Sequence, residues 1–442
     1  MYEFLLWLIW IVSCLAVIWI SLRTKYDLLS PIWLITVFYV LGFIVRPVTI
    51  MTLGDGSFYD DWGFSRNETI KVMVLAELYG LLGYLCFYFG YRLKAARILS
   101  SKLPSLPDPS KSDLWTIVII LFSLVGFIAY SQYLIQIGAS LTRFSISDIV
   151  VGARARTGMY YLQMASELFV IANLIWFVRL GKPRSFWLLH SIIAAIILLS
   201  FYARQYIFSY FLMLLVIYVY TSKKKISKSF LLISGMIAIA ILAYMVKIRS
   251  YLYAGSSLGD ATTEAFALYG SEESILLYFL FSGLTSYFDY FCLIISRAGS
   301  ELDYQFGYLL KWLFEAPIPR QLLDDKLVVI NRLVSIKLDE IRPDAPAISM
   351  LGDFYLNGHI LGIIIGMVFS GVLMRAMYFY KNRSLGNLLI YALFMGSFFM
   401  IFRSHLGASL VSFLMKAFPV VLGAGFIYIC RSICMRRHPK EL

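Results

Sequence analysis

The feature that most constrains this chain is a series of apolar segments, each long enough to cross a lipid bilayer. A membrane-spanning helix needs roughly 20 mainly apolar residues. Segments of this kind lie at 4–22, 28–51, 69–90, 114–137, 159–178, 186–203, 205–221, 229–247, 347–374, 386–402 and 406–430. Because only helices and closed barrels satisfy their backbone in lipid, the series predicts an all-α, polytopic integral membrane protein with eleven transmembrane helices.

Composition supports the same fold class. Hydrophobic residues make up 60% of the chain and charged residues 15%, whereas a soluble domain usually carries about 25% charged residues. The sequence therefore argues against a soluble enzyme, a disordered protein and a secreted disulfide scaffold. We expect one polytopic membrane domain over residues 1–442.

The distribution of charge predicts the orientation. With the N-terminus outside, the inner segments hold 21 of the 39 basic residues but only 4 of the 26 acidic ones, in agreement with the positive-inside rule. This count requires that the apolar run at 275–295 does not cross the bilayer, and we interpret it as an interfacial or re-entrant helix on the outer side. The same excess of basic residues in cytoplasmic loops accounts for the net charge of +13, so we expect contact with membrane lipids and no nucleic-acid partner.

The segment from 248 to 346 is then a large external loop. Leu323, Leu327, Ile330 and Val334 repeat at helical spacing along one face, which predicts an amphipathic helix that lies on the membrane or caps a cavity. Loops of this length in compact proteins are usually functional.

Several arginines lie at the predicted outer ends of spans. Arg204 stands between two apolar runs with no Gly or Pro around it, so its guanidinium either points into a cavity or snorkels to the interface. Arg403 and His405 share a second tight outer hairpin. Further outer arginines, for which ion pairing with the outer acids is the alternative, are Arg46, Arg249, Arg320 and Arg342. Arginine binds phosphate bidentately, so this group suggests a polyanionic lipid headgroup.

The ninth span begins with a polar run that we expect to be broken. Asn357 and Gly358 interrupt an apolar block that is too long for one straight crossing, and broken helices in membranes line cavities. Asp353 would then lie on the first half-helix, where it either accepts a proton from a hydroxyl group or pairs with an arginine. No Cys or His spacing fits a metal site, so we expect neither a metal nor a cofactor.

Taken together, these features resemble the bacterial oligosaccharide repeat-unit polymerases of the Wzy type, which build O-antigen, enterobacterial common antigen and capsule. The resemblance covers nearly the whole chain and rests on five features: the hairpin with Arg204, the large outer loop, the Pro-x-Pro-Arg stretch at 317–320, the Gly-Asp-x-Tyr-x-Asn-Gly run at 352–358, and the hairpin with Arg403. The family often has Gly-Glu in the fourth feature, so Asp353 would be a shorter version of that acid.

The resemblance implies an enzyme of the bacterial inner membrane with its active site facing the periplasm. It would transfer a growing glycan from undecaprenyl diphosphate to a repeat unit carried on a second undecaprenyl diphosphate, and a chain-length regulator protein would be a partner. Asp353 is then the candidate base, and Arg204 and Arg403 the candidate clamps on the leaving diphosphate. Supporting contacts to substrate would come from Arg46, Arg249, Arg320, Arg342, Asn357 and His405.

Two alternatives remain open. An O-antigen ligase has the same general architecture and differs in its acceptor. A lipid-linked oligosaccharide flippase also has many spans and cavity arginines, but flippases usually show two related halves, and this chain has no visible internal repeat.

Overall fold

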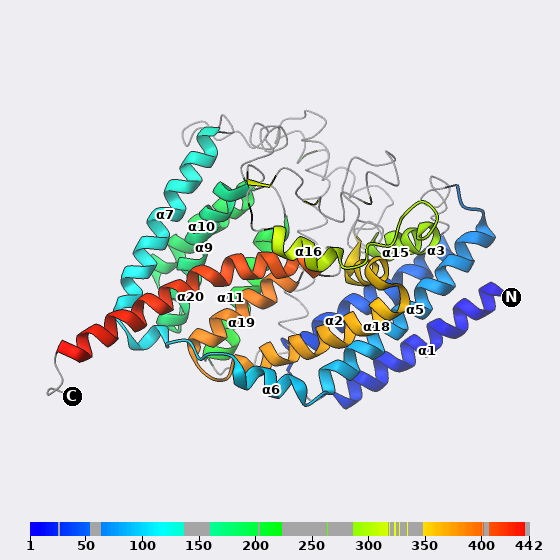
Figure 1. Cartoon of the computed structure of the whole chain (residues 1–442), viewed down its shortest axis with the longest axis horizontal. Helices are drawn as coiled ribbons and strands as arrows, with labels where there is room; N and C mark the ends of the chain where they lie inside the picture. The colour runs from blue at the N-terminus through cyan, green and yellow to red at the C-terminus, as the bar shows by residue number, and fades with distance from the viewer. Residues whose placement is uncertain are drawn as a thin grey trace. The chain divides into compact units, whose positions relative to one another are not determined.

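The structure is a computed structural model. It describes residues 1–24, 27–53, 63–136, 160–201, 204–222, 263, 286–316, 318, 322–323, 327, 334, 348–399, 401 and 406–437. The described elements are all helices (Figure 1). They are α1 (Tyr2–Arg23), α2 (Pro31–Tyr39), the π-helix η1 (Val40–Val45), α3 (Arg46–Leu53), α5 (Arg66–Arg92), α6 (Ala95–Lys102), the 3-10 helix η2 (Pro109–Lys111), α7 (Leu114–Gln136), α9 (Tyr160–Leu180), α10 (Ser185–Ser200), α11 (Arg204–Ser222), α15 (Ser286–Arg297), α16 (Tyr308–Glu315), α18 (Ser349–Tyr380), α19 (Leu385–Phe398) and α20 (Leu406–Arg437).

This architecture confirms the predicted fold class. Among the described residues, eight helices are long and apolar enough to cross a membrane, and α10 and α19 are apolar but shorter. Ten of the eleven predicted spans coincide with described helices, and the predicted span at 229–247 lies outside the described residues. The protein is therefore an all-α polytopic membrane protein.

The chain divides into two compact units. The first comprises Met1–Leu103, Leu276–Phe379 and Ser397–Ser412, and the second comprises Pro104–Ile275, Tyr380–Gly396 and Phe413–Leu442. The prediction of a single domain over the whole chain stays a prediction.

In the first unit, α5 is the central helix. It begins with a capping box, in which the Glu68 backbone N–H donates to Ser65 Oγ (3.4 Å) and the Ser65 N–H donates to Glu68 Oε2 (2.9 Å). Helices α1, α2 and α15 pack against α5. Helix α18 also approaches it closely, because a Cβ at Gly90 would lie 2.1 Å from the carbonyl oxygen of Val368.

Helix α15 packs against the π-helix η1 of the second predicted span. The ring of Tyr287 lies against Gly42, where an added Cβ would meet Tyr287 Cε2 at 2.1 Å, and its hydroxyl donates to the Phe38 carbonyl. π-Helical turns are rare and appear mostly as short bulges inside α-helices, where they are common sites of kinks. Helix α15 has 12 residues, and the first part of the 275–295 run, 275–285, lies outside the described residues, so the prediction that this run does not cross the bilayer stays a prediction.

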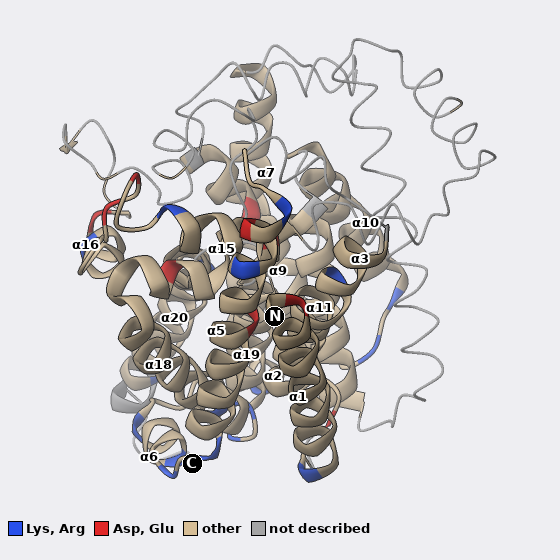
Figure 2. Ribbon diagram, turned by 90° about the vertical axis from the view of Figure 1, so that its right-hand side faces the viewer, with Lys and Arg blue, Asp and Glu red and all other residues tan. Residues whose placement is uncertain are grey.

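Within each unit, the helix ends that the charge count assigns to one side of the membrane lie together. In the first unit, Arg375 near the end of α18 donates to the carbonyl of Tyr91 at the end of α5 (2.5 Å), and the ends of α1 and α6 lie toward the lower edge of Figure 2. In the second unit, Arg179 pairs with Asp113 (2.6 Å), both in predicted inner segments. The grouping agrees with the predicted topology, while the side that each group faces stays a prediction.

The predicted amphipathic helix of the large loop is described only at single positions. Leu323 and Leu327 are not helical, Val334 is helical and buried, and most of the predicted helix, including Ile330, lies outside the described residues. Besides α15, the loop contains α16, which buries Tyr308 and Trp312 and exposes the apolar side chains of Leu310 and Phe314.

Candidate functional site

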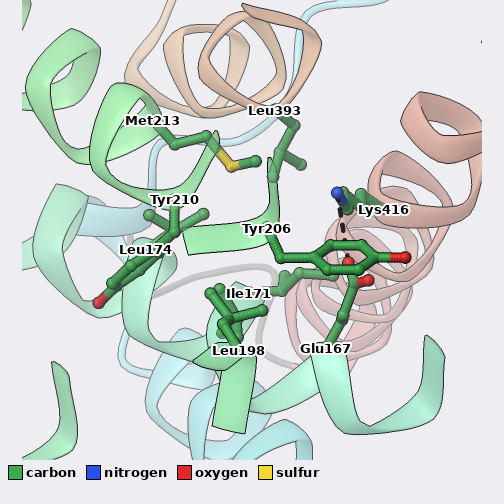
Figure 3. A pocket seen from close by; sticks show the side chains of 10 residues that line it. Glu167, Ile171, Leu174, Leu198, Tyr206, Tyr210, Met213, Leu393 and Lys416 are labelled. Atoms are coloured by element: carbon green, nitrogen blue, oxygen red, sulfur yellow. Dashed lines mark ion pairs between the residues drawn. The ribbon is translucent and has the colours of Figure 1, made fainter. Parts of the chain in front are cut away.

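A pocket in the second unit is surrounded by helices that all belong to predicted spans (Figure 3). Helices α9, α10, α11, α19 and α20 contribute its walls. Its empty space amounts to about 270 Å³ when the open mouth is included, but between the walls there is room only for a small group. The lining residues are Glu167, Val170, Ile171, Leu174, Leu198, Tyr206, Tyr210, Met213, Leu393 and Lys416.

Two charged side chains face each other on the wall of this otherwise apolar pocket. Lys416 Nζ lies 3.3 Å from Glu167 Oε2, and the two side chains are each only 9% exposed. Lys416 Nζ also lies 6.0 Å from the centre of the Tyr206 ring, and Figure 3 shows these three side chains together at one end of the pocket. Charged side chains inside membrane spans are energetically costly and are usually functional. This ion pair is therefore the best candidate for a functional site in the described part of the second unit.

The sequence analysis did not single out these two residues. Glu167 is an isolated acid within the predicted span at 159–178, and Lys416 is an isolated base within the span at 406–430. The rule that identified Arg204, a charge with no solvated loop around it, applies equally to both. What could not be foreseen is that they are partners.

A hydrogen-bonded network holds the neighbouring wall in place. Tyr210, which lines the pocket, donates from its hydroxyl to Asn173 Oδ1 (2.7 Å) and contacts Ser191 Oγ at 2.5 Å. The Asn173 amide nitrogen in turn lies 3.0 Å from His190 Nδ1, and the His190 ring is stacked on Phe169. Buried polar networks whose hydrogen bonds are all satisfied make the helices that carry them rigid. This network therefore fixes α11 against α9 and α10.

Arg204 is the first residue of α11, and its side chain is not among those described. Tyr206, two residues later, lines the pocket. Both residues belong to the first turn of α11, but on different faces of the helix because they are two positions apart.

In the first unit, α18 is broken where the sequence predicts a break. Gly358 (φ −172°, ψ 23°) and His359 (φ 53°, ψ −143°) leave the helical conformation. A positive φ at a histidine is a strained backbone conformation. The break is held by the preceding loop: the Gln305 N–H donates to the Leu356 carbonyl (2.7 Å), and the Leu309 N–H donates to Asn357 Oδ1 (3.1 Å).

Asp353 lies on the first half-helix, as predicted, and is 1% exposed. Its Oδ1 accepts a hydrogen bond from Asn357 Nδ2 (2.9 Å), and its Oδ2 accepts one from the backbone N–H of Leu406 (3.2 Å). Leu406 begins α20, so the carboxylate lies at the positive end of that helix. The observed partners are therefore amide groups that join the broken helix to the start of α20.

Tyr308, at the start of α16, belongs to the same polar region. Burial, followed by the charges of Glu315 and Asp353, raises the pKa of Tyr308 to about 12. The phenol is therefore neutral at physiological pH and remains a hydrogen-bond donor.

Arg46, for which the sequence left substrate binding and ion pairing open, lies in a buried ion pair. Arg46 Nη2 lies 2.8 Å from Asp289 Oδ2, and Nε contacts both carboxylate oxygens at 3.1 and 3.2 Å. The exposed fractions of the two side chains are 3% and 1%. This guanidinium therefore attaches α15 to the second span.

The remaining predicted site residues lie outside the described residues: Arg249, Arg320, Arg342, Arg403 and His405. Asn357 is described and acts as a bridge, since it accepts from Leu309 and donates to Asp353. Among the described residues, no group of three or more His, Cys, Asp or Glu side chains is placed to hold a metal ion.

Comparison with known proteins adds no family to these observations. No family model, curated protein or solved structure matches this chain.

Proposed function

We propose that the protein is a metal-independent membrane glycosyltransferase that polymerises lipid-linked oligosaccharide repeat units at the periplasmic face of the bacterial inner membrane. The observation that carries the proposal is the position of Arg204. It begins the helix whose first turn lines a pocket containing charged side chains within the membrane-spanning region.

In the proposed reaction, a hydroxyl oxygen of the acceptor repeat unit forms a bond to the anomeric carbon of the donor glycan. The bond from that carbon to undecaprenyl diphosphate breaks, and the diphosphate leaves with the electron pair. The acceptor proton passes to a protein carboxylate, for which Asp353 is the candidate from the sequence. Arg204 and Arg403 would stabilise the developing charge on the diphosphate, which is the role that preorganised cations have in such transfers.

The broken helix supports the same proposal. Interrupted spans are tolerated where they border a cavity or are buried in protein, and here the break brings Asp353 and Asn357 to the start of α20. The hairpin that contains Arg403 precedes α20 directly in the sequence.

The test is the pattern of surface glycan in a deletion strain of the source organism. Loss of a polymerase leaves single repeat units on the surface, whereas loss of a flippase removes surface repeats and loss of a ligase leaves polymer on the lipid carrier. A deletion strain that keeps its full glycan ladder would refute all three activities.

Arg204→Lys tests the proposed clamp on the diphosphate. Lysine keeps the charge but loses the bidentate fork, and losing one contact to a developing anion costs roughly a hundred- to a thousandfold in rate. We therefore expect the polymer yield to collapse at normal protein levels. Arg184→Lys is the matched control. Arg184 precedes the first residue of α10, at the end of that helix that we predict to face the cytoplasm. The substitution should leave the glycan ladder unchanged.

A further inference from the structure

The ion pair between Glu167 and Lys416 differs from an ion pair that only supports the fold. Its two charged groups make one contact, of 3.3 Å, and each side chain remains slightly exposed on the pocket wall. Replacing a buried ion pair with apolar residues of similar size is often neutral or stabilising. Stability alone therefore gives little reason to keep two charges among Ile171, Leu174 and Leu198.

The charge of the pair restricts the chemistry of a ligand. A carboxylate and an ammonium group side by side have no net charge, so an anion approaching Lys416 would be repelled by Glu167, and a cation approaching Glu167 would be repelled by Lys416. A hydroxyl group suits both, because its oxygen accepts from an ammonium group and its hydrogen is donated to a carboxylate. One hydroxyl on a neutral ring can satisfy both charges at once.

The rest of the pocket fits the same class of ligand. The ring of Tyr206 adjoins Lys416, and the opposite walls are apolar, formed by aliphatic side chains with Met213 and the ring of Tyr210. Sugar rings present hydroxyls on their edges and C–H groups on their faces, which pack on aromatic and apolar side chains. The space between the walls admits about one water-sized group, so it suits a single hydroxyl at the edge of a sugar while the ring itself stays at the mouth.

We propose that Glu167 and Lys416, with Tyr206, bind a hydroxyl group of a neutral sugar unit in the glycan substrate. The inference rests on the proposed function for the identity of the ligand. The binding site itself is built from residues that the sequence analysis did not assign to substrate.

An apolar double variant separates ligand binding from support of the fold. Glu167→Leu/Lys416→Met removes both charges and leaves no side-chain group that can bond a hydroxyl. We expect this variant to accumulate and unfold like the wild type, because replacing a buried ion pair with apolar residues of similar size is often neutral or stabilising. Its polymer yield should fall about tenfold to a hundredfold, since hydrogen bonds to charged groups are lost. The control is Arg179→Met/Asp113→Leu, at an ion pair that does not line the pocket, and it should retain normal ladders.

An apolar variant that accumulates normally and still builds full-length polymer would overturn the inference, because a pair that only supports the fold can be replaced without loss of substrate binding. If Glu167→Leu/Lys416→Met does not accumulate, Glu167→Met/Lys416→Met decides the question, since methionine adapts to the shape of the space around it. Loss of polymer from that protein at normal abundance supports the site, and full ladders refute it. Failure of the proposed function looks different: deletion of the whole gene would then leave the glycan ladder unchanged.

Discussion

Asp353→Asn is the most informative single substitution, because its effect follows from the hydrogen bonds around one carboxylate. Both oxygens accept: Oδ1 from Asn357 and Oδ2 from the Leu406 N–H. Asparagine has only one accepting oxygen, so its amide nitrogen must face one of these donors. Turning the Asn357 amide over does not help, because its oxygen already accepts from the Leu309 N–H.

The cost can be worked from these contacts. One buried donor left without an acceptor costs about 1–3 kcal/mol, and removing a negative charge from the start of α20 costs about 0.3–1 kcal/mol more. We expect Asp353→Asn to lower the free energy of unfolding by about 2–3 kcal/mol. The measurement is unfolding in mixed micelles titrated with denaturing detergent, followed by intrinsic fluorescence.

The reversed pair Asp353→Asn/Asn357→Asp gives the decisive comparison. In that variant the new amide at position 353 would accept from the Leu406 N–H and donate to the new carboxylate at position 357, which would also accept from Leu309. The backbone carbonyl of residue 353 would lose the hydrogen bond that it now accepts from Asn357 Nδ2 (2.9 Å). We therefore expect the double variant to recover all but about 1 kcal/mol of the lost stability. The exposed residue Asp303 serves as the control, since Asp303→Asn should change stability by less than about 0.5 kcal/mol.

The same pair of variants separates structure from chemistry. If Asp353 only joins the helix break to α20, the reversed pair should restore polymer together with stability. If Asp353 is the base, stability should return without polymer. A single variant as stable as the wild type, or a double variant no more stable than the single one, would refute the hydrogen-bond reasoning.

Three further outcomes follow from the first unit and the topology. Asp289→Ala should lower the free energy of unfolding by about 3–5 kcal/mol, because it leaves Arg46 charged and buried. The double variant Arg46→Met/Asp289→Leu should be clearly more stable than Asp289→Ala. Equal stability of the two variants in the same unfolding assay would contradict a buried ion pair. Gly42→Ala should cost about 1–3 kcal/mol, because the new methyl group meets a tyrosine ring of α15; an unchanged unfolding midpoint would show that the ring moves away freely. Reporter fusions should read cytoplasmic at Lys381 and periplasmic at Asp325, and a cytoplasmic reading at Asp325 would restore 275–295 as a crossing.

The fold class could be read from the sequence because the requirement for a membrane span is local. Each stretch of roughly 20 apolar residues satisfies its own backbone as a helix, independently of its neighbours. The break in the ninth span was also accessible, since Asn357 and Gly358 interrupt an overlong apolar block and the structure leaves the helical conformation at Gly358 and His359. Arginines and lysines likewise indicated which helix ends lie together within each unit.

The partners of the charged residues were decided only by the tertiary structure. For Arg46 the sequence left substrate binding and ion pairing open, and the structure pairs it with Asp289 in α15. Asp353 was expected to face an arginine or a hydroxyl, and in the structure it accepts from the first N–H of α20. Glu167 and Lys416 are far apart in the sequence and meet because α9 and α20 both border one pocket.

The physical reason is that helix packing in lipid leaves little trace in an apolar pattern. Lipid tails are as apolar as leucine, so a hydrophobic face does not mark the side of a helix that contacts its neighbours. Small residues such as Gly42 permit close approach but do not say which side chain will fill the space. From the sequence one can tell that a charge such as Glu167 must be satisfied, and only the packing of the helices decides that Lys416 is the group that satisfies it.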